Sequence, residues 1–133
     1  MRYMLDTDIC VYASRKNRPQ VIARVGKHSP GDLVISTVTY GELRFGAEKS
    51  AQPNAALRVL NEFIEAVPVV PLENQTAEHY GRIRHLLERQ GRAIGANDLW
   101  IAAHCLQLGL TLVTNNEREF SRIPNLAIEN WTH

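Results

Sequence analysis

The residues of this sequence best suited to chemistry are acidic side chains placed next to apolar segments. Asp6 and Asp8 come directly after an apolar run, and Asp98 begins another. Glu42 lies one turn into an expected helix, and Glu119 follows a turn rich in Asn. Carboxylates gathered at one place repel one another by about 1 kcal/mol per pair at 4 Å in bulk water and about 4 kcal/mol at an effective dielectric of 20. Protons or a cation must therefore compensate for their charge.

Oxygen ligands without histidine or cysteine among them favour Mg²⁺ or Mn²⁺ over zinc. Such an ion polarises a phosphoryl oxygen and lowers the pKa of a bound water molecule, and a second ion can stabilise the leaving oxygen. Hydrolysis of a phosphodiester bond is the chemistry that this set of residues suits best.

The elements that must position these acids are short strands alternating with longer helices. Apolar runs bounded by polar, Gly or Pro residues predict buried strands at 3–5, 33–35, 67–70, 111–113 and 126–128. The longer segments between them predict helices at 8–15, 19–27, 38–50, 53–66, 74–90 and 98–108. This alternation predicts an α/β fold whose parallel sheet is covered on both faces. Ligands of such sheets bind beyond the carboxyl ends of the strands, where four separate segments would deliver the oxygen-bearing side chains.

The length and composition predict one soluble globular domain that spans residues 1–133. Hydrophobic residues make up 44% of the chain and charged residues 22%, as in ordinary globular proteins. The net charge of +1 gives no global sign of a nucleic-acid binder. Removing the five acids above leaves nine acidic against 15 basic residues, so the rest of the chain carries +6. An acidic pocket in basic surroundings suits a metal ion that meets a polyanion.

The cysteines and the apolar segments indicate a cytoplasmic protein. Cys10 and Cys105 lie in apolar segments without metal-binding spacing, which predicts buried free thiols in a reducing compartment. The start of the chain lacks the apolar stretch of a signal peptide. The richest apolar region, 99–113, is too short to span a bilayer.

Each acid also has a purely structural interpretation. Asp8 is a good N-cap for the helix that follows it, and this is its favoured role. Glu42 could pair with Thr39 in a capping box. Asp98 or its neighbour Asn97 could cap the apolar helix that starts there.

Four motifs together resemble PIN-domain ribonucleases, most closely the VapC toxins of bacterial type II toxin–antitoxin pairs. They are MLDTDI near the N-terminus, IS-x-VT-x-GEL-RFGAEKS over 35–50, GRAIGANDLWIAAHC from 91, and LVTNN-x-REF over 112–120. The resemblance runs over nearly the whole chain in the family's order and spacing. It implies a PIN-like three-layer α/β/α fold with a central, mainly parallel sheet of four or five strands and six or seven flanking helices.

The resemblance also assigns roles to the acids. Asp6, Glu42 and Asp98 match the three acids that bind Mg²⁺ or Mn²⁺ in the family and ready the attacking water. At the fourth metal-binding position this chain departs from the pattern, because Asn116 stands where many relatives have an acid. Glu119 is a possible substitute ligand there.

Hydroxyl side chains fall at strand ends where the family uses hydroxyls to hold the acids or to touch phosphate. These residues are Thr7, Ser36 and Thr114. Helix capping and turn bonding are equally good roles for them.

RNA contacts are less well marked by the sequence. Arg44 and Lys49 lie just beyond the second acid and could meet phosphate, whereas Arg82 belongs to a helix whose i,i+4 pairs indicate a solvated face. Trp100 and Tyr40 could stack on a base, although core packing is favoured for Trp100.

As a whole, the resemblance implies a Mg²⁺- or Mn²⁺-dependent endoribonuclease toxin that inhibits translation by cutting RNA, for example a tRNA anticodon stem-loop. It further implies a homodimer and a VapB-type antitoxin that blocks the acidic pocket and contacts operator DNA through its own DNA-binding part.

Three other functions stay open. A metal-free ribonuclease would use two imidazoles as acid and base. Their candidates are His79, His85 and His104. A haloacid-dehalogenase-like phosphatase would use Asp6 as nucleophile and Asp8 as general acid, although a downstream acid pair is lacking. A non-catalytic RNA- or protein-binding module is the third, with Asn116 marking a decayed site.

Overall fold

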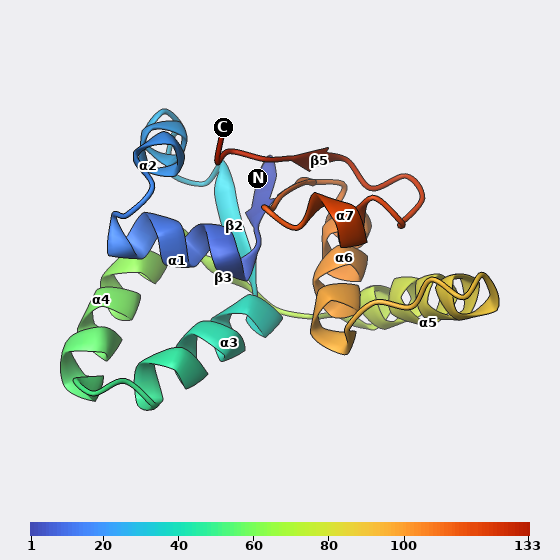
Figure 1. Cartoon of the computed structure of the whole chain (residues 1–133), viewed down its shortest axis with the longest axis horizontal. Coiled ribbons are helices and arrows are strands. Elements are labelled where there is room, and N and C mark those ends of the chain that lie inside the picture. The colour runs from blue at the N-terminus through green and yellow to red at the C-terminus, as the bar shows by residue number, and fades with distance from the viewer.

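The computed structural model describes residues 1–133 and contains five strands and seven helices (Figure 1). The strands are β1 (Tyr3–Leu5), β2 (Leu33–Ser36), β3 (Val69–Val70), β4 (Thr111–Val113) and β5 (Ile128–Glu129). The helices are α1 (Thr7–Arg15), α2 (Pro19–Gly26), α3 (Thr37–Glu48), α4 (Pro53–Ala66), α5 (Asn74–Arg89), α6 (Ala96–Leu108) and α7 (Glu117–Phe120).

The strands form one sheet in the order β3-β2-β1-β4-β5, and every neighbouring pair is parallel. Tyr3 at the start of β1 lies opposite Leu33 of β2 on one side and Thr111 of β4 on the other. The parallel sheet expected from the alternation of strands and helices is therefore confirmed.

The side chains of the central strands divide between two hydrophobic clusters, one on each face of the sheet. Met4 and Leu112 join the cluster that α5, α6 and the α7 segment cover. Leu5 and Val113 join the cluster beneath α1 and α2. Figure 1 shows α1–α4 on one side of the sheet and α5–α7 on the other. The three-layer α/β/α architecture is confirmed.

Several predicted boundaries were wrong, mostly because local signals compete at the ends of elements. The third strand is confined to Val69–Val70, since Val67 ends α4. The fifth strand is shifted to Ile128–Glu129, and the short helix α7 was not predicted. Helix α6 begins at Ala96, two residues before the expected start.

Both cysteines are buried free thiols, as predicted for Cys10 and Cys105. Burial raises the pKa of the Cys10 thiol well above its usual range, and the nearby negative charges of Asp6 and Asp8 raise it further. None of the helices combines the length and the apolar character that a membrane crossing requires.

Candidate active site

The acidic side chains meet at the edge of the sheet where the carboxyl ends of the central strands lie. Helices α1 and α3 begin directly after β1 and β2, and Figure 1 shows the start of α6 and the short α7 near the same edge. Because parallel strands end together at one edge, acids far apart in the sequence become neighbours there.

Asp6 is the N-cap of α1 and is held by two donors. Its Oδ1 accepts a hydrogen bond from the backbone N–H of Thr7 at 2.8 Å, and its Oδ2 accepts one from the Thr114 hydroxyl at 2.7 Å. The side chain is buried, with 6% of the residue exposed. Burial raises its pKa from 3.8 to about 7, with a further rise from the charges of Asp8 and Asp98 and a partial lowering by the two donors.

Glu42 reaches the same edge from the second turn of α3. Its Oε1 accepts a hydrogen bond of 2.6 Å from the Thr7 hydroxyl. The structural alternative for Glu42, a capping box with Thr39, is wrong, because α3 begins at Thr37 and is capped by Ser36, whose Oγ accepts the backbone N–H of Val38 at 3.1 Å. Freed from capping, Glu42 is available to a ligand.

Asp98 lies in the first turn of α6 and faces other carboxylates. Burial raises its pKa from 3.8 to about 7, and the adjoining carboxyl of Glu119 is the next largest cause, followed by the charges of Glu42 and Asp8. The alternative in which Asp98 or Asn97 caps this helix is wrong, since Gly95 occupies the N-cap position.

Asn116 and Glu119 lie beside each other at the start of α7. The Asn116 side-chain amide donates to Oε2 of Glu119 at 3.0 Å. Glu119 thus lies between Asp98 and Asn116, the residue that matches the fourth metal-binding position. The two residues named as alternative ligands thus form one unit.

Asp8 does not cap its helix, contrary to the favoured prediction. The helix begins one residue earlier, at Thr7, with Asp6 as its N-cap. The carboxylate of Asp8 accepts the backbone N–H of Ile9 at 2.7 Å and that of Asn115 at 3.2 Å, which ties α1 to the turn after β4. Burial raises the pKa of Asp8, and these N–H groups oppose that rise.

The three predicted hydroxyls have different partners. Thr7 and Thr114 donate to Glu42 and Asp6, so these two hold acids. Ser36 touches no acid: its fully buried Oγ lies 2.8 Å from Nδ1 of His104 and caps α3. Ser36 therefore has the alternative role of capping a helix and does not hold an acid.

The basic residues proposed for RNA are less directly placed. Arg44 is paired with Glu48 at 2.8 Å on the exposed surface of α3. Lys49 lies above the Phe45 ring, with Nζ 4.9 Å from the centroid. Arg82 lines a separate pocket of about 340 Å³ on the α5 side, which contains none of the acids.

The donors are suited to a hard divalent cation, although no three His, Cys, Asp or Glu side chains are already arranged as a metal cage. All the acids at this edge offer oxygen, which Mg²⁺ and Mn²⁺ prefer. The raised pKa values of Asp6 and Asp98 show that protein donors leave their negative charge uncompensated. Asp6, Glu42 and Asp98 are therefore fit to hold such an ion, with Glu119 and Asn116 beside them.

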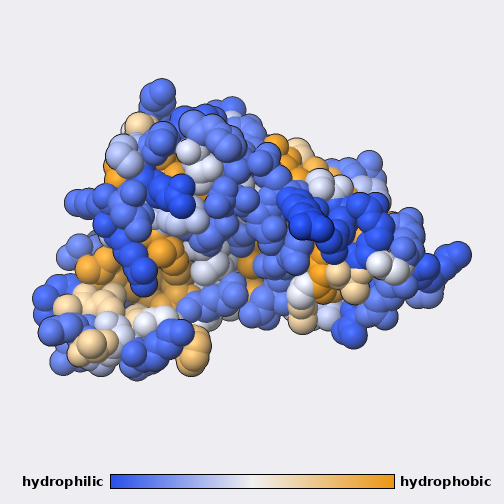
Figure 2. Space-filling view, viewed as in Figure 1, coloured by the Kyte–Doolittle hydropathy of each residue, from blue (hydrophilic) through white to orange (hydrophobic).

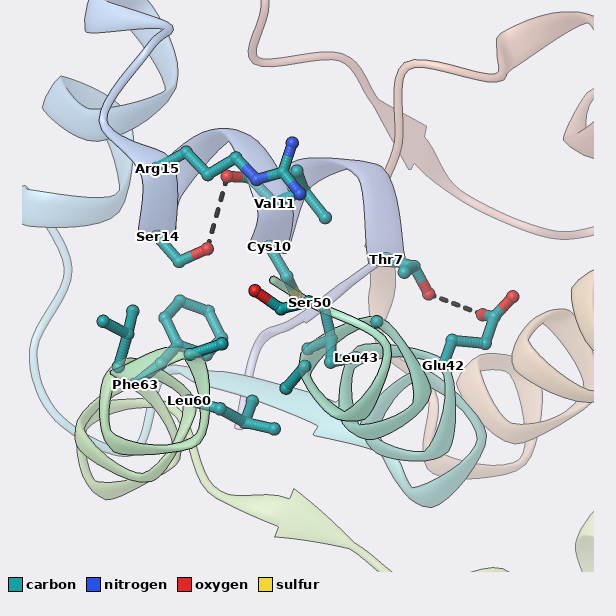
Figure 3. Close-up of a pocket in the computed structure, with 14 residues that line it drawn as sticks. Thr7, Cys10, Val11, Ser14, Arg15, Glu42, Leu43, Ser50, Leu60 and Phe63 are labelled. Carbon is teal, nitrogen blue, oxygen red and sulfur yellow. Dashed lines mark hydrogen bonds between the residues drawn. The ribbon is translucent and has the colours of Figure 1, made fainter. Parts of the chain in front are cut away.

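An apolar groove of about 350 Å³ opens next to Glu42, between α1, α3 and α4 (Figure 3). Leu43, Leu60 and Phe63 form its apolar lining, while Thr7 and Glu42 lie at one end. Figure 2 shows hydrophobic residues exposed between α1 and the pair α3 and α4. The groove connects the acidic edge to a surface able to bind an apolar segment.

The side-chain arrangement does not favour the imidazole or the phosphatase mechanism. His104 is fully buried against Ser36, whereas His79 and His85 lie on α5. Asp8, the acid of the phosphatase alternative, is engaged by two backbone N–H groups.

The fold and the acidic edge define a PIN-domain protein, and a model of the PIN-domain family matches residues 3–126. Ribonuclease VapC1 of Haemophilus influenzae strain R2866 is 46% identical, and 99% of each chain is covered. The tRNA(fMet)-specific endonuclease VapC of Shigella flexneri is 41% identical, again over 99% of each chain. The crystal structure of DNA-bound VapBC from Salmonella typhimurium contains a chain that superposes with a TM-score of 0.93 at 39% identity, covering 98% of both chains. This chain belongs to the VapC family of PIN-domain ribonucleases.

Proposed function

We propose that this protein is a Mg²⁺- or Mn²⁺-dependent endoribonuclease, the toxin of a type II toxin–antitoxin pair. The observation that carries the proposal is the meeting of carboxylates from separate elements, where Asp6 and Asp98 both have a pKa near 7. Fold maintenance gains nothing from buried like charges, whereas a cation-dependent reaction requires them.

Asp6, Glu42 and Asp98 would hold the ion, which when bound would polarise a phosphoryl oxygen and lower the pKa of the attacking water. Thr114 and Thr7 fix the carboxylates of Asp6 and Glu42 through hydrogen bonds of 2.7 and 2.6 Å. Such hydroxyl donors orient ligand oxygens before substrate arrives, so little reorganisation is needed during the reaction. Glu119, held by the Asn116 amide, supplies a further oxygen at the edge next to Asp98.

The substrate is proposed to be RNA, and a tRNA is the first candidate. Support comes from the relative named tRNA(fMet)-specific endonuclease VapC, which is 41% identical over 99% of both chains. Cleavage of such an RNA would inhibit translation. Buried free thiols suit action in the reducing cytoplasm.

The test is cleavage of purified tRNA with Mg²⁺ or Mn²⁺, with and without a chelator. Wild-type protein is expected to cut only with the ion, leaving 5′-phosphate and 3′-hydroxyl ends. Glu42→Gln should abolish cutting, while Glu78→Gln, an exposed residue of α5, is the matched control that should not. Cutting that persists in the chelator, or that leaves a cyclic phosphate, would refute the metal-dependent mechanism.

We further propose that a VapB-type antitoxin lays an apolar segment in the groove between α1, α3 and α4. Related VapC chains have been crystallised as VapBC complexes, and the groove ends at Glu42, so a basic side chain of the segment would meet the acidic edge. Val59 lines the groove and is 46% exposed. The antitoxin would contact operator DNA, and the toxin would form a homodimer.

Substitution of Val59 tests this docking. Val59→Asp should abolish co-purification with the product of the neighbouring reading frame while RNA cleavage is retained. Asn61→Asp adds the same charge to an exposed position of α4 outside the groove and should leave co-purification intact. Full co-purification of Val59→Asp would place the partner elsewhere.

A further inference from the structure

A second, open cleft lies on the other side of Glu42 from the apolar groove. It has a volume of about 680 Å³, and its lining includes Thr37, Gly41, Glu42 and Phe45 of α3 together with Asn97 of α6. Only two of its seven lining residues are hydrophobic. The cleft therefore differs from a protein-binding groove, whose centre is normally apolar.

Phe45 is the unusual feature of this cleft. It is 65% exposed, the highest value among the exposed large hydrophobic residues of the chain. It follows Glu42 by three residues on α3, so both side chains lie on one face of the helix. Lys49, one turn further on, places Nζ 4.9 Å from the ring centroid. An exposed ring with a cation beside it is a common platform for nucleic-acid bases.

The two aromatic residues suggested by the sequence are already engaged elsewhere. Trp100 stacks on Tyr80 with ring centroids 4.0 Å apart, and Tyr40 packs against the hydrophobic cluster beneath α1. Phe45 stacks on no other aromatic ring, and only the Lys49 cation lies over it. A base that enters the cleft can therefore reach its ring.

Two further residues complete the lining next to Glu42. Gly41 precedes Glu42 on α3 and has no side chain to fill the cleft. Asn97 contributes the amide of the lining, a group able to donate to and accept from the edge of a base. Together these residues offer stacking and edge recognition next to a carboxylate of the acidic edge.

We propose that this cleft is a nucleobase subsite in which Phe45 stacks on an unpaired base next to the phosphate that is cut. The inference rests on the proposed ribonuclease function and assigns it a specificity-determining residue. Bases of single-stranded loops are splayed out and stacked on aromatic side chains in RNA recognition, whereas duplex bases are not accessible in this way. The subsite therefore selects a loop nucleotide.

Substitutions of Phe45 combined with changes in the RNA test the stacking. The probe is an RNA hairpin that carries the anticodon loop of initiator tRNA, with variants in which one nucleotide near the cut is abasic. On the intact hairpin, Phe45→Ala should raise KM about 5- to 100-fold, and Phe45→Trp should restore it. On the hairpin that is abasic at the stacked position, wild type and Phe45→Ala should have the same KM. Leu72→Ala, a control at another exposed apolar residue outside the cleft, should behave as wild type.

Binding of the same hairpins in chelator, followed by fluorescence anisotropy, gives a readout that does not need catalysis. Phe45→Ala should lose affinity for the intact hairpin by the same factor as its KM rises, and Phe45→Trp should recover that affinity. Unchanged KM and affinity in Phe45→Ala, or a defect that persists on every abasic hairpin, would overturn the subsite while the ribonuclease proposal stands. Failure of wild type to cut any RNA would instead refute the proposed function.

Light scattering tests whether a second copy of the chain, instead of RNA, occupies this surface. Phe45→Ala should have the molar mass of wild type in solution. A lower mass for Phe45→Ala would assign the ring to an interface between copies and overturn the subsite.

Discussion

The two ends of β1 lie in opposite kinds of environment. At its amino end, the Tyr3 ring packs against His28 and Trp131 with centroid distances of 5.0 and 5.2 Å, and His28 stacks on Trp131 at 5.1 Å. At its carboxyl end, burial raises the pKa of Asp6, and the charges of nearby carboxylates raise it further. One short strand thus joins a region of favourable contacts to a region of electrostatic repulsion.

The polar groups of the two regions differ in the same way. In the aromatic region Glu129 accepts from the Trp131 indole N–H at 2.9 Å and pairs with Arg24 at 3.3 Å, so the charge of this carboxylate is compensated by a cation. At the acidic edge the donors are neutral hydroxyl and amide groups, which orient carboxylates without cancelling their charge. The aromatic region stabilises the fold, and the acidic edge lowers stability in a way that a cation can reverse.

The largest expected effect comes from Asp6→Asn, which should separate activity from stability. Removing a ligand charge should lower kcat/KM for RNA about 10³-fold, because a bound ion supplies several kcal/mol to the transition state. The free energy of unfolding at pH 8 should rise, since a buried repelling charge is lost. Cleavage assays and denaturant titrations measure the two. Glu78→Gln, at an exposed position of α5 away from the site, is the control. A destabilised Asp6→Asn would show that the acidic edge does not lower stability.

Trp131→Ala should have the opposite pattern. The side chain is fully buried, so its truncation should lower the free energy of unfolding by about 3–5 kcal/mol. The rate of RNA cleavage per folded molecule should change little, because no acid at the edge contacts this residue. Urea denaturation gives the stability, and Trp131→Phe should recover part of the loss. A cleavage defect as large as that of Asp6→Asn would show that the two regions are not independent.

The metal-free protein should lose stability as the pH rises from about 4 to about 7. Asp6 has a folded-state pKa near 7 against an ordinary value of 3.8, so the folded state holds the proton over this interval and the unfolded state does not. Saturating Mn²⁺ at pH 8 should add stability by RT ln(1 + [M]/Kd), about 2.7 kcal/mol at 100 times Kd. Thermal unfolding with and without the ion measures both effects. If Asp6→Asn retained the full pH dependence, another group would be responsible.

The smallest of these effects is expected for Thr114→Val. The substitution removes the 2.7 Å hydrogen bond to Asp6 but conserves side-chain shape. Because that bond lowers the pKa of Asp6, its loss should move the acid limb of the pH–rate profile to higher pH and weaken metal affinity about tenfold. Thr132→Val, a hydroxyl bonded to Asn130 and Asn115, is the matched control. An unmoved acid limb would exclude Thr114 as a determinant of the Asp6 pKa.

Much of the fold could be predicted from local patterns. The spans of β1, β4 and α4 agree with the predicted residues, because each is an apolar or amphipathic run with clear boundaries. Helix α7 was missed because four residues contain too little periodicity to be recognised. The fifth strand was displaced because its apolar residues continue into the preceding loop.

The acids of the candidate site could be predicted from the sequence, whereas the groups that they contact could not. Motif spacing identified Asp6, Glu42 and Asp98, which the structure brings to one edge. The prediction that Asp8 caps α1 was wrong because several positions near a helix start satisfy the same local preference. Phe45, the residue proposed to stack on a base, was not singled out from the sequence, although its place three residues after Glu42 was a usable signal.

By itself, the sequence determined the alternation of strands and helices, the buried thiols and the identity of the acids, since these depend on residue type and spacing along the chain. Only the tertiary structure decided that Thr7 reaches Glu42, that Ser36 turns to His104 and that Phe45 stays exposed. The physical reason is that hydrogen-bond partners and exposure depend on how distant segments pack, and a local pattern is compatible with several such arrangements.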